Sequence, residues 1–199
     1  AALRLVAKEL DPKTALIGFA GAPWTLATYM VEGGASRDFA LVKSWAYRDP
    51  DGFSRLIELL TQAVIEHLAA QVASGAEAVQ LFESWAGALS ASEFRRWSIE
   101  PARRIVAGLR QRGITVPVIG FPRAGGHGYA EYARDSGVNA LSLDPAVPLS
   151  TARELQRAVT VQGNLDPILL LAGGAAMRAG AGAILDALGE GPLVFNLGH

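Results

Sequence analysis

The order of apolar and polar residues divides this chain into short apolar runs that alternate with longer segments of helical period. The apolar runs occupy residues 16–19, 78–82, 116–121, 140–143, 159–162 and 193–197. Each run has the length of a strand buried on both faces, and turn-forming residues bound the runs. We therefore expect a strand at each run, and every strand except the last is followed by a predicted helix.

Residues 16–34 contain this strand-and-helix unit in its most compact form. A glycine turn follows the strand, and Pro23 stands at the first helical position, where its missing N–H costs nothing. Gly33 and Gly34 end the predicted helix, as C-cap residues do. Tyr29 lies on this helix, and binding groups of parallel α/β folds gather at the carboxyl ends of strands.

Residues 50–73 carry the clearest helical pattern, with apolar residues at a spacing of about 3.6 and polar residues on the opposite face. Pro101 predicts a kink or a boundary within another helix. The further helices are expected at residues 1–10, 90–112, 129–136 and 175–188, with one more after Ser150 or Thr151. Three helices are expected to begin at a hydroxyl side chain that caps them, namely Ser36, Ser90 and Thr151. Ser90 with Glu93 and Thr151 with Glu154 have the spacing of a capping box.

Strands that alternate with helices predict a parallel sheet with right-handed crossovers. Such a sheet either stays open and doubly wound or closes into a (β/α)8 barrel, and closure would need two units beyond those predicted. The chain begins in a helix ahead of its first strand, so we expect earlier material of the fold to be absent. No linker rich in Pro, Gly or Ser divides residues 1–199, which indicates one domain, incomplete as given.

Composition narrows the class of protein. The chain has 18 Lys and Arg, 19 Asp and Glu, and a hydrophobic fraction of 50%, as expected of a globular chain with a substantial core. A net charge of −1 gives no electrostatic reason to expect nucleic acid or a membrane as partner. No apolar run approaches the roughly 18 residues of a membrane helix, and the first residues lack the layout of a signal peptide. The absence of Cys excludes disulfides and thiolate metal sites, and a cytoplasmic enzyme is the default expectation.

Polar residues at the ends of the predicted strands are the candidates for a functional site: Tyr29, Glu83, Ser84, Arg123, His127, Asp144, Asn164, Asp166 and His199. Most have a structural alternative. Glu83 with Ser84 would more simply cap the next turn, and the two Asp-Pro pairs have the form of turn initiators. Tyr29, taken alone, would be a packing residue. His199 is more informative, because a histidine directly after a strand and a glycine reaches the mouth of a barrel.

Several familiar kinds of site are not indicated. The glycine-rich loop at residues 125–128 follows a strand but lacks both the G-x-G-x-x-G spacing and the Lys-Ser/Thr of a P-loop. The 3 histidines include no His-x-x-x-His pair, so we do not expect a metal site. No G-x-S-x-G elbow of a hydrolase occurs.

Four segments carry a resemblance to a known family. They are GFAGAPWTLATYMVEGG at residues 18–34, GAEAVQLFESWAG at 75–87, VQGNLDP at 161–167 and FNLGH at 195–199. In order and approximate spacing they resemble the uroporphyrinogen decarboxylases of haem biosynthesis, and together they cover nearly the whole chain. The resemblance implies a distorted (β/α)8 TIM-type barrel, of which residues 1–199 would supply about six of eight units as one partial domain. It also implies a homodimer that needs no cofactor and no metal.

The resemblance further implies removal, as CO2, of the four acetate side chains of uroporphyrinogen III to give coproporphyrinogen III. Tyr29, Ser84 and His199 match substrate-contacting positions of the family pattern. The first two would hydrogen-bond substrate carboxylates, and His199 would orient or protonate the substrate near the ring. Phe19 and Phe82 would form apolar walls against the macrocycle. The family's arginine-rich motif and an aspartate belong to a part of the pattern before residue 1, so we expect this chain alone not to decarboxylate.

Two other functions stay open at this point. A related barrel methyltransferase acting on corrinoid or thiol substrates would commonly use zinc with cysteine, and the absence of Cys counts against it. A non-catalytic tetrapyrrole-binding or scaffold fragment would need neither the arginine motif nor the aspartate.

Overall fold

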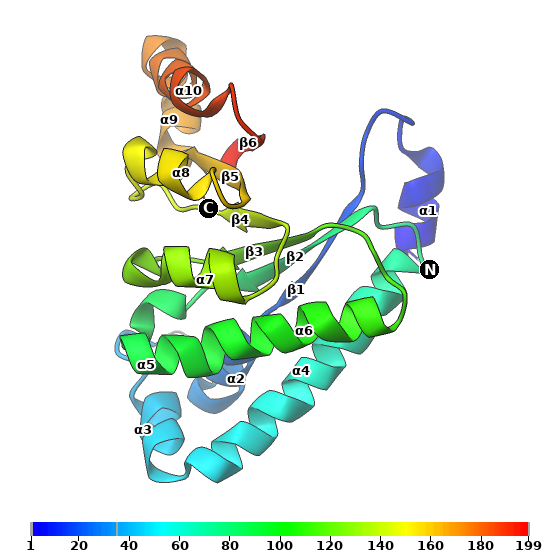
Figure 1. Cartoon of the computed structure of the whole chain (residues 1–199), viewed down its shortest axis with the longest axis vertical. Helices are drawn as coiled ribbons and strands as arrows, with labels where there is room; N and C mark the ends of the chain where they lie inside the picture. The colour runs from blue at the N-terminus through cyan, green and yellow to red at the C-terminus, as the bar shows by residue number, and fades with distance from the viewer. Residues whose placement is uncertain (1, 35, 199) are drawn as a thin grey trace.

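A computed structural model describes residues 2–34 and 36–198, the side chain of His127 excepted. Its centre is one parallel sheet in which the strands lie side by side in sequence order (Figure 1). The strands are β1 (Ile17–Gly21), β2 (Ala78–Glu83), β3 (Val118–Pro122), β4 (Ala140–Ser142), β5 (Thr160–Leu165) and β6 (Leu193–Leu197). Every apolar run therefore forms a strand, and the sequential order is the one in which a barrel winds.

Helices cover the sheet and connect each strand to the next. They are α1 (Ala2–Glu9), α2 (Pro23–Glu32), α3 (Ala40–Arg48), α4 (Pro50–Val72), α5 (Ala91–Phe94), α6 (Glu100–Gln111), α7 (Tyr129–Asp135), α8 (Leu149–Leu155), α9 (Pro167–Ala172) and α10 (Gly174–Leu188). The long helices α4 and α6 pack together on one side of the molecule, and α9 with α10 lies at the other end of the sheet, beside β5 and β6 (Figure 1). No helix among the described residues is long and apolar enough to cross a membrane.

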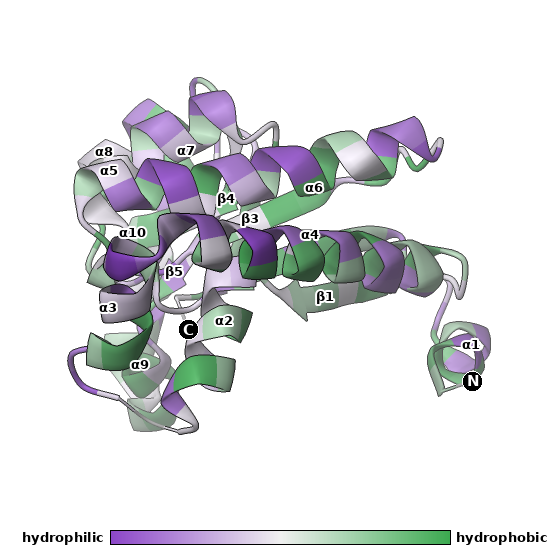
Figure 2. Ribbon diagram, turned by 90° about the horizontal axis from the view of Figure 1, so that it is seen from below, coloured by the Kyte–Doolittle hydropathy of each residue, from purple (hydrophilic) through white to green (hydrophobic). Residues whose placement is uncertain are grey.

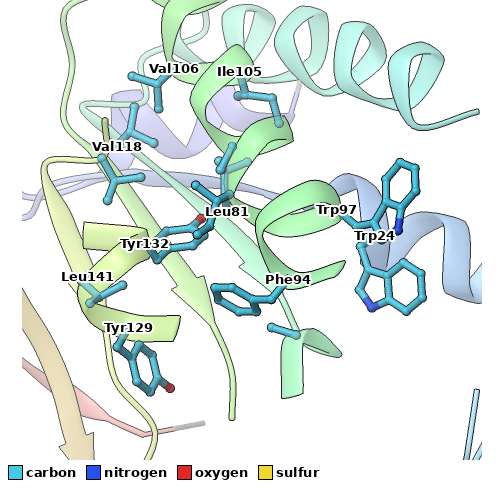
Figure 3. Close-up of a cluster of buried hydrophobic side chains, with 14 of the residues drawn as sticks. Trp24, Leu81, Phe94, Trp97, Ile105, Val106, Val118, Tyr129, Tyr132 and Leu141 are labelled. Carbon is cyan, nitrogen blue, oxygen red and sulfur yellow. The ribbon is translucent and has the colours of Figure 1, made fainter. Parts of the chain in front are cut away.

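The strands have two faces with different surroundings. Val79 and Leu81 on β2 are fully buried against the helices, together with Leu141 on β4. Side chains from α6, α7 and these strands meet in this core (Figure 3), and α6 alternates between polar and apolar residues as a helix on such a core does (Figure 2). The alternate residues Gln80 and Phe82 point to the opposite face, because side chains alternate along a strand.

The outer edge of β1 is covered by a side chain. Gln71 of α4 is buried, accepts a hydrogen bond from the backbone N of Phe19 at 2.8 Å and donates one to its carbonyl oxygen at 2.7 Å. An amide side chain thus occupies the hydrogen-bonding positions that a neighbouring strand would take. β1 and β6 are the two edges of the sheet within the described residues.

The predicted helix boundaries are confirmed where glycine and proline set them. Pro23 opens α2, and Gly33 ends it with a φ of 71°, the left-handed conformation that favours glycine. The helix predicted at 90–112 is interrupted by a π-helical turn at Arg95–Ile99, directly before α6, in which Pro101 occupies the first turn. The boundary expected from Pro101 is therefore present.

Of the three predicted capping residues, only Ser90 stands at the N-cap of a helix, and none of the three side chains makes the predicted capping hydrogen bond. Phe39, with a left-handed φ of 52°, directly precedes α3, so Ser36 caps the preceding bend by accepting from the N of Phe39 at 3.0 Å. Ser90 does precede α5, but its side chain makes no capping hydrogen bond, and α8 begins after Pro148, ahead of Thr151. The apolar run predicted at 159–162 extends to residue 165 as β5, and the short helix α9 was not predicted.

Candidate active site

The exit of β2 and the start of α2 are held together by several hydrogen bonds. The N of Ala22 donates to the carbonyl oxygen of Phe82 at 2.9 Å, and the indole Nε1 of Trp24 donates to the carbonyl oxygen of Trp85 at 3.1 Å. These bonds fix α2 on the end of the strand. The two segments are far apart in the sequence, yet they position Tyr29 on α2 against the residues that follow β2.

Glu83 completes this junction from the helix side of the sheet. Its Oε1 accepts from the N of Thr25 at 2.7 Å and from the Thr25 hydroxyl, in the first turn of α2, where Ala22 supplies no capping side chain. Its Oε2 is buried and has no hydrogen-bond partner among the described residues. Glu83 is thus a cap of the helix that precedes it in sequence, and the expectation that it caps the following turn is wrong.

Burial raises the pKa of the Glu83 carboxyl to about 8. Desolvation outweighs the hydrogen bonds from Thr25, which act in the opposite direction. The carboxyl is therefore neutral at pH 7. A neutral acid at this position spares the core an unpaired charge, and one carboxyl oxygen still serves α2 as an acceptor.

Tyr29 is not a buried packing residue. It is 49% exposed, and its ring meets that of Trp85 edge-on at 6.2 Å between centroids. Trp85 also contacts Phe39, with ring centroids 5.1 Å apart. The ring of Tyr29 is held by Trp85, next in sequence to Ser84, and its hydroxyl makes no hydrogen bond within the described part of the chain. The structure therefore brings Tyr29 close to the exit that carries Ser84.

A cavity of about 750 Å³ opens at the carboxyl ends of β2, β3 and β4. Its lining includes Ser84 and the aromatic residues Phe39 and Trp85. The charged residues of the lining are Arg37, Asp38, Lys43, Arg123 and Asp144. Lys43 and Arg37 were not among the sequence candidates, because they lie on α3 and on the loop before it, where the sequence pattern marks no strand exit.

Asp144 has a structural role at the edge of this cavity. Its Oδ2 accepts from the N of Ala124 at 2.9 Å and from the hydroxyl of Tyr129, and its Oδ1 accepts from the N of Ala146 at 3.0 Å. Burial, followed by the hydrogen bond to Asp144, raises the pKa of Tyr129 above its usual range. The interpretation of Asp144 as a turn initiator is confirmed.

Two further candidates also serve the backbone. Asp166 caps α9 by accepting from the N of Ile168 at 2.8 Å, as expected of a turn initiator. The amide of Asn164 donates to the carbonyl oxygens of Asp144 and Val147, each at 3.0 Å. Both residues therefore stabilise the turns that follow β4 and β5.

The inner face of the sheet carries a row of phenylalanines across three strands. Phe19 and Phe82 meet edge-on at 5.8 Å between ring centroids, and Phe82 meets Phe121 at 6.0 Å. Phe19 is 62% exposed and Phe121 is buried, so the row offers an open apolar surface on β1 and β2. On β2 the surface becomes polar one pleat before Phe82, at Gln80, which lies opposite Phe19 in the register and accepts a hydrogen bond from Gln162 at 3.2 Å.

The remaining histidines add little to this site. His199 and the side chain of His127 lie outside the described residues, and His67 is exposed on α4. No group of three His, Cys, Asp or Glu residues within the described ranges is arranged to hold a metal ion.

Known proteins resemble this chain along its whole length. A family sequence model described as Uroporphyrinogen decarboxylase (URO-D) matches residues 1–199. The relative named uroporphyrinogen decarboxylase in Rhodospirillum rubrum is 51% identical over 198 residues, and its counterpart in Novosphingobium aromaticivorans is 50% identical over 195 residues. These matches cover 99% and 98% of this chain and 57% of each relative, so the chain spans little more than half the length of these relatives.

The fold also matches a solved structure. A methyltransferase from Methanosarcina mazei has a TM-score of 0.80 to this chain at 18% identity, covering 99% of this chain and 56% of that one. Identity at this level indicates a common fold and no more. With the parallel strands in sequence order, it confirms the predicted α/β fold of TIM-barrel type.

Proposed function

This chain belongs to the uroporphyrinogen decarboxylase family, and from that premise we propose that its site binds uroporphyrinogen III and takes part in decarboxylating its four acetate side chains to coproporphyrinogen III. The observation that carries the proposal is the exit of β2. There Ser84 follows Phe82 and Glu83, the ring of the half-exposed Tyr29 meets that of Trp85, and Phe82 meets the exposed ring of Phe19 on β1. Hydroxyl donors beside an open apolar surface suit a macrocycle that carries carboxylates on its rim.

The chemistry needs a proton and an electron sink. Protonation of a pyrrole carbon gives an iminium-like ring, and the electron pair of the breaking C–C bond flows into that ring as CO2 leaves. The exocyclic methylene carbon then takes up a proton and becomes a methyl group, while the ring returns its proton. Each acetate thus consumes one proton and releases one CO2, and no external oxidant or reductant is required.

Each candidate residue has a distinct part in this proposal. Tyr29 and Ser84 donate hydrogen bonds to substrate carboxylates and orient the acetate that reacts. Phe19 and Phe82 form the apolar wall under the ring and exclude water from one of its faces. His199 orients or protonates the substrate near the ring. The reaction proceeds without a cofactor, in keeping with the family resemblance.

The same premise supports two wider proposals, that the protein acts as a homodimer and that it is cytoplasmic. We also propose that neither nucleic acid nor a membrane is a partner, which agrees with the net charge of −1.

The test is anaerobic equilibrium dialysis of the 199-residue chain against uroporphyrinogen III, quantified after oxidation to the porphyrin. We expect saturable binding that Tyr29→Phe and Ser84→Ala each weaken about fivefold to tenfold, since each variant loses a hydrogen bond to a charged group. Tyr47→Phe is the matched control, because Tyr47 is a 56% exposed tyrosine on α3. Absence of saturable binding, or equal weakening by Tyr47→Phe, would refute the proposal.

The same samples separate catalysis from binding alone. Coproporphyrinogen appearing in the dialysis compartment with the protein would show turnover by this chain. Binding without product is the result expected of residues 1–199 alone, whereas product would contradict the expectation that this chain by itself does not decarboxylate.

A further inference from the structure

The cavity beside Ser84 has a lining that suits an anion. Of the arginines that the structure describes, only Arg110 and Arg123 are partly buried, and the others are exposed. The guanidinium of Arg110 is satisfied by the carbonyl oxygens of Ile114 and Val116 and by Asn139. Arg123 lines the cavity, and among the described residues its guanidinium has no hydrogen-bond or ion-pair partner.

We propose that this cavity is a subsite for one carboxylate arm of the tetrapyrrole, bound by Arg123 together with Lys43 and Arg37. The inference rests on the proposed function and deepens it. In this proposal Arg123, at the exit of β3, and Arg37 and Lys43, in the segment between α2 and α4, contribute to substrate recognition.

The walls of the cavity are held in place by bonds that do not involve the arginine head groups. The Nζ of Lys43 donates to the carbonyl oxygen of Ala88 at 3.0 Å, which leaves two of its N–H groups for a ligand. The backbone of Arg123 donates to the carbonyl oxygen of Glu83 at 3.1 Å and accepts from the N of Gly87 at 3.1 Å. The exits of β2 and β3 are therefore tied together beneath the cavity.

Gly87 and the start of α3 complete this frame. A Cβ on Gly87 would lie 2.8 Å from the backbone oxygen of Ala124, so only glycine allows the two exits to approach this closely. On the other side, Glu32 of α2 accepts from the N of Leu41 and Val42 at 3.0 and 3.1 Å. This bond fixes the start of α3, the helix that carries Lys43.

The charge balance of the lining favours a single carboxylate. The two acidic residues of the lining are Asp144 and Asp38. Asp144 already accepts three hydrogen bonds, from Tyr129 and two backbone N–H groups, so its oxygens are not free to pair with Arg123. Asp38 is exposed to solvent. Three cations against two anions leave one net positive charge, and a planar guanidinium fits a carboxylate through paired hydrogen bonds.

The carboxylate arm in the subsite belongs to the same tetrapyrrole macrocycle that contacts the other proposed substrate-binding residues. Ser84 lines the cavity and is also one of the proposed substrate contacts, while Phe39 and Trp85 provide apolar surface for the methylene groups of the arm. Uroporphyrinogen offers two kinds of arm, the acetates that react and the propionates that remain. The test distinguishes them, because coproporphyrinogen keeps the propionates and has methyl groups in place of the acetates.

The experiment is anaerobic equilibrium dialysis of the 199-residue chain with uroporphyrinogen III and, separately, coproporphyrinogen III. Arg123→Gln is expected to weaken uroporphyrinogen binding about tenfold, and the loss should shrink as salt is raised. Arg48→Gln removes an exposed charge from α3 and is the matched control, with no expected effect. Arg37→Gln is a second variant of the subsite. Arg37 is exposed on the loop before α3, so this variant tests the subsite even if Arg123→Gln does not fold.

Each outcome has a defined meaning. Equal weakening of both ligands by Arg123→Gln places a propionate in the subsite, and weakening of uroporphyrinogen alone places an acetate there. The inference is overturned if folded Arg123→Gln and Arg37→Gln bind both ligands as the unaltered chain does, or if Arg48→Gln weakens binding as much as they do. If the unaltered chain binds neither ligand, the proposed function fails for this chain and the subsite fails with it.

Discussion

The buried carboxyl of Glu83 should make the stability of this protein depend on pH in an unusual direction. Its pKa in the folded state is about 8, whereas the ordinary value is 4.5. Between these two values the folded chain holds a proton that the unfolded chain has released. The free energy of unfolding therefore falls as the pH rises from about 4.5 through about 8, opposite to the usual effect of a paired carboxylate.

The size of the effect follows from the two pKa values. Each pH unit between them is worth about 1.4 kcal/mol, so the whole interval corresponds to a loss on the order of 5 kcal/mol. Glu83→Gln removes the titration and keeps an amide oxygen that accepts from Thr25. The amide nitrogen of the variant would occupy the position of Oε2, which has no hydrogen-bond partner within the described residues. Burying its unpaired N–H groups should lower the free energy of unfolding by about 1 kcal/mol.

Urea unfolding at pH 5, 7 and 9 tests this reasoning, with far-ultraviolet and near-ultraviolet circular dichroism as two independent probes. We expect Glu83→Gln to be slightly less stable than the unaltered chain at pH 5 and several kcal/mol more stable at pH 9. Glu58→Gln is the control, because Glu58 is exposed and its carboxylate pairs with Arg104 at the surface. If the curves for Glu83→Gln and the unaltered chain run parallel from pH 5 to 9, the carboxyl is ionised when buried and the argument fails.

Three backbone and capping positions give further predictions for urea unfolding. Gly120→Ala should lower the free energy of unfolding by about 1–3 kcal/mol, because its Cβ would lie 2.5 Å from the buried ring of Tyr132. Gly182→Ala, in α10 with open space around it, should instead raise it by up to about 1 kcal/mol, and a loss there would contradict the packing argument. Asp49→Ala should cost about 1 kcal/mol, since its Oδ1 caps α4 by accepting from the N of Gly52 at 2.8 Å, whereas Asp49→Asn should retain most of that stability.

The positions of the strands could be predicted because each is a short apolar run between turn residues, and the runs show where the strands begin. Their ends were less predictable. β5 continues through Gly163 and Asn164, which pair with Phe195 and Asn196 of β6 although they read as a loop. Polar residues at a strand exit are compatible with a strand or with a loop. Whether they form a strand depends on pairing with the neighbouring strand.

The local chemistry of the site was partly readable from the sequence. Asp166 and the Oδ1 of Asp144 each accept from a backbone N two residues on, so the local pattern identifies both as turn residues, whereas the bonds from Ala124 and Tyr129 to the Oδ2 of Asp144 have no local signal. Lys43 and Arg123 meet at one cavity only because α3 folds back over the exits of β2 and β3. No spacing along a single sequence encodes such a meeting. The expectation that Glu83 caps the following turn is wrong for the same reason. The helix that Glu83 caps, through the N of Thr25, belongs to the preceding strand-and-helix unit.

The alternation of side chains along β2 explains how one strand exit can serve both stability and the proposed binding. Phe82 points to the inner face and belongs to the aromatic row, while Glu83 points to the helices and holds the start of α2. Ser84 follows where the strand has ended and lines the cavity. A one-residue slip of this strand would place the carboxyl of Glu83 among the phenylalanines and a phenyl ring at the start of α2. The raised pKa of Glu83 is therefore a consequence of the register that places Phe82 on the inner face and Ser84 in the lining of the cavity. Its pH-dependent contribution to stability should persist in any variant of the ligand contacts that leaves this register intact.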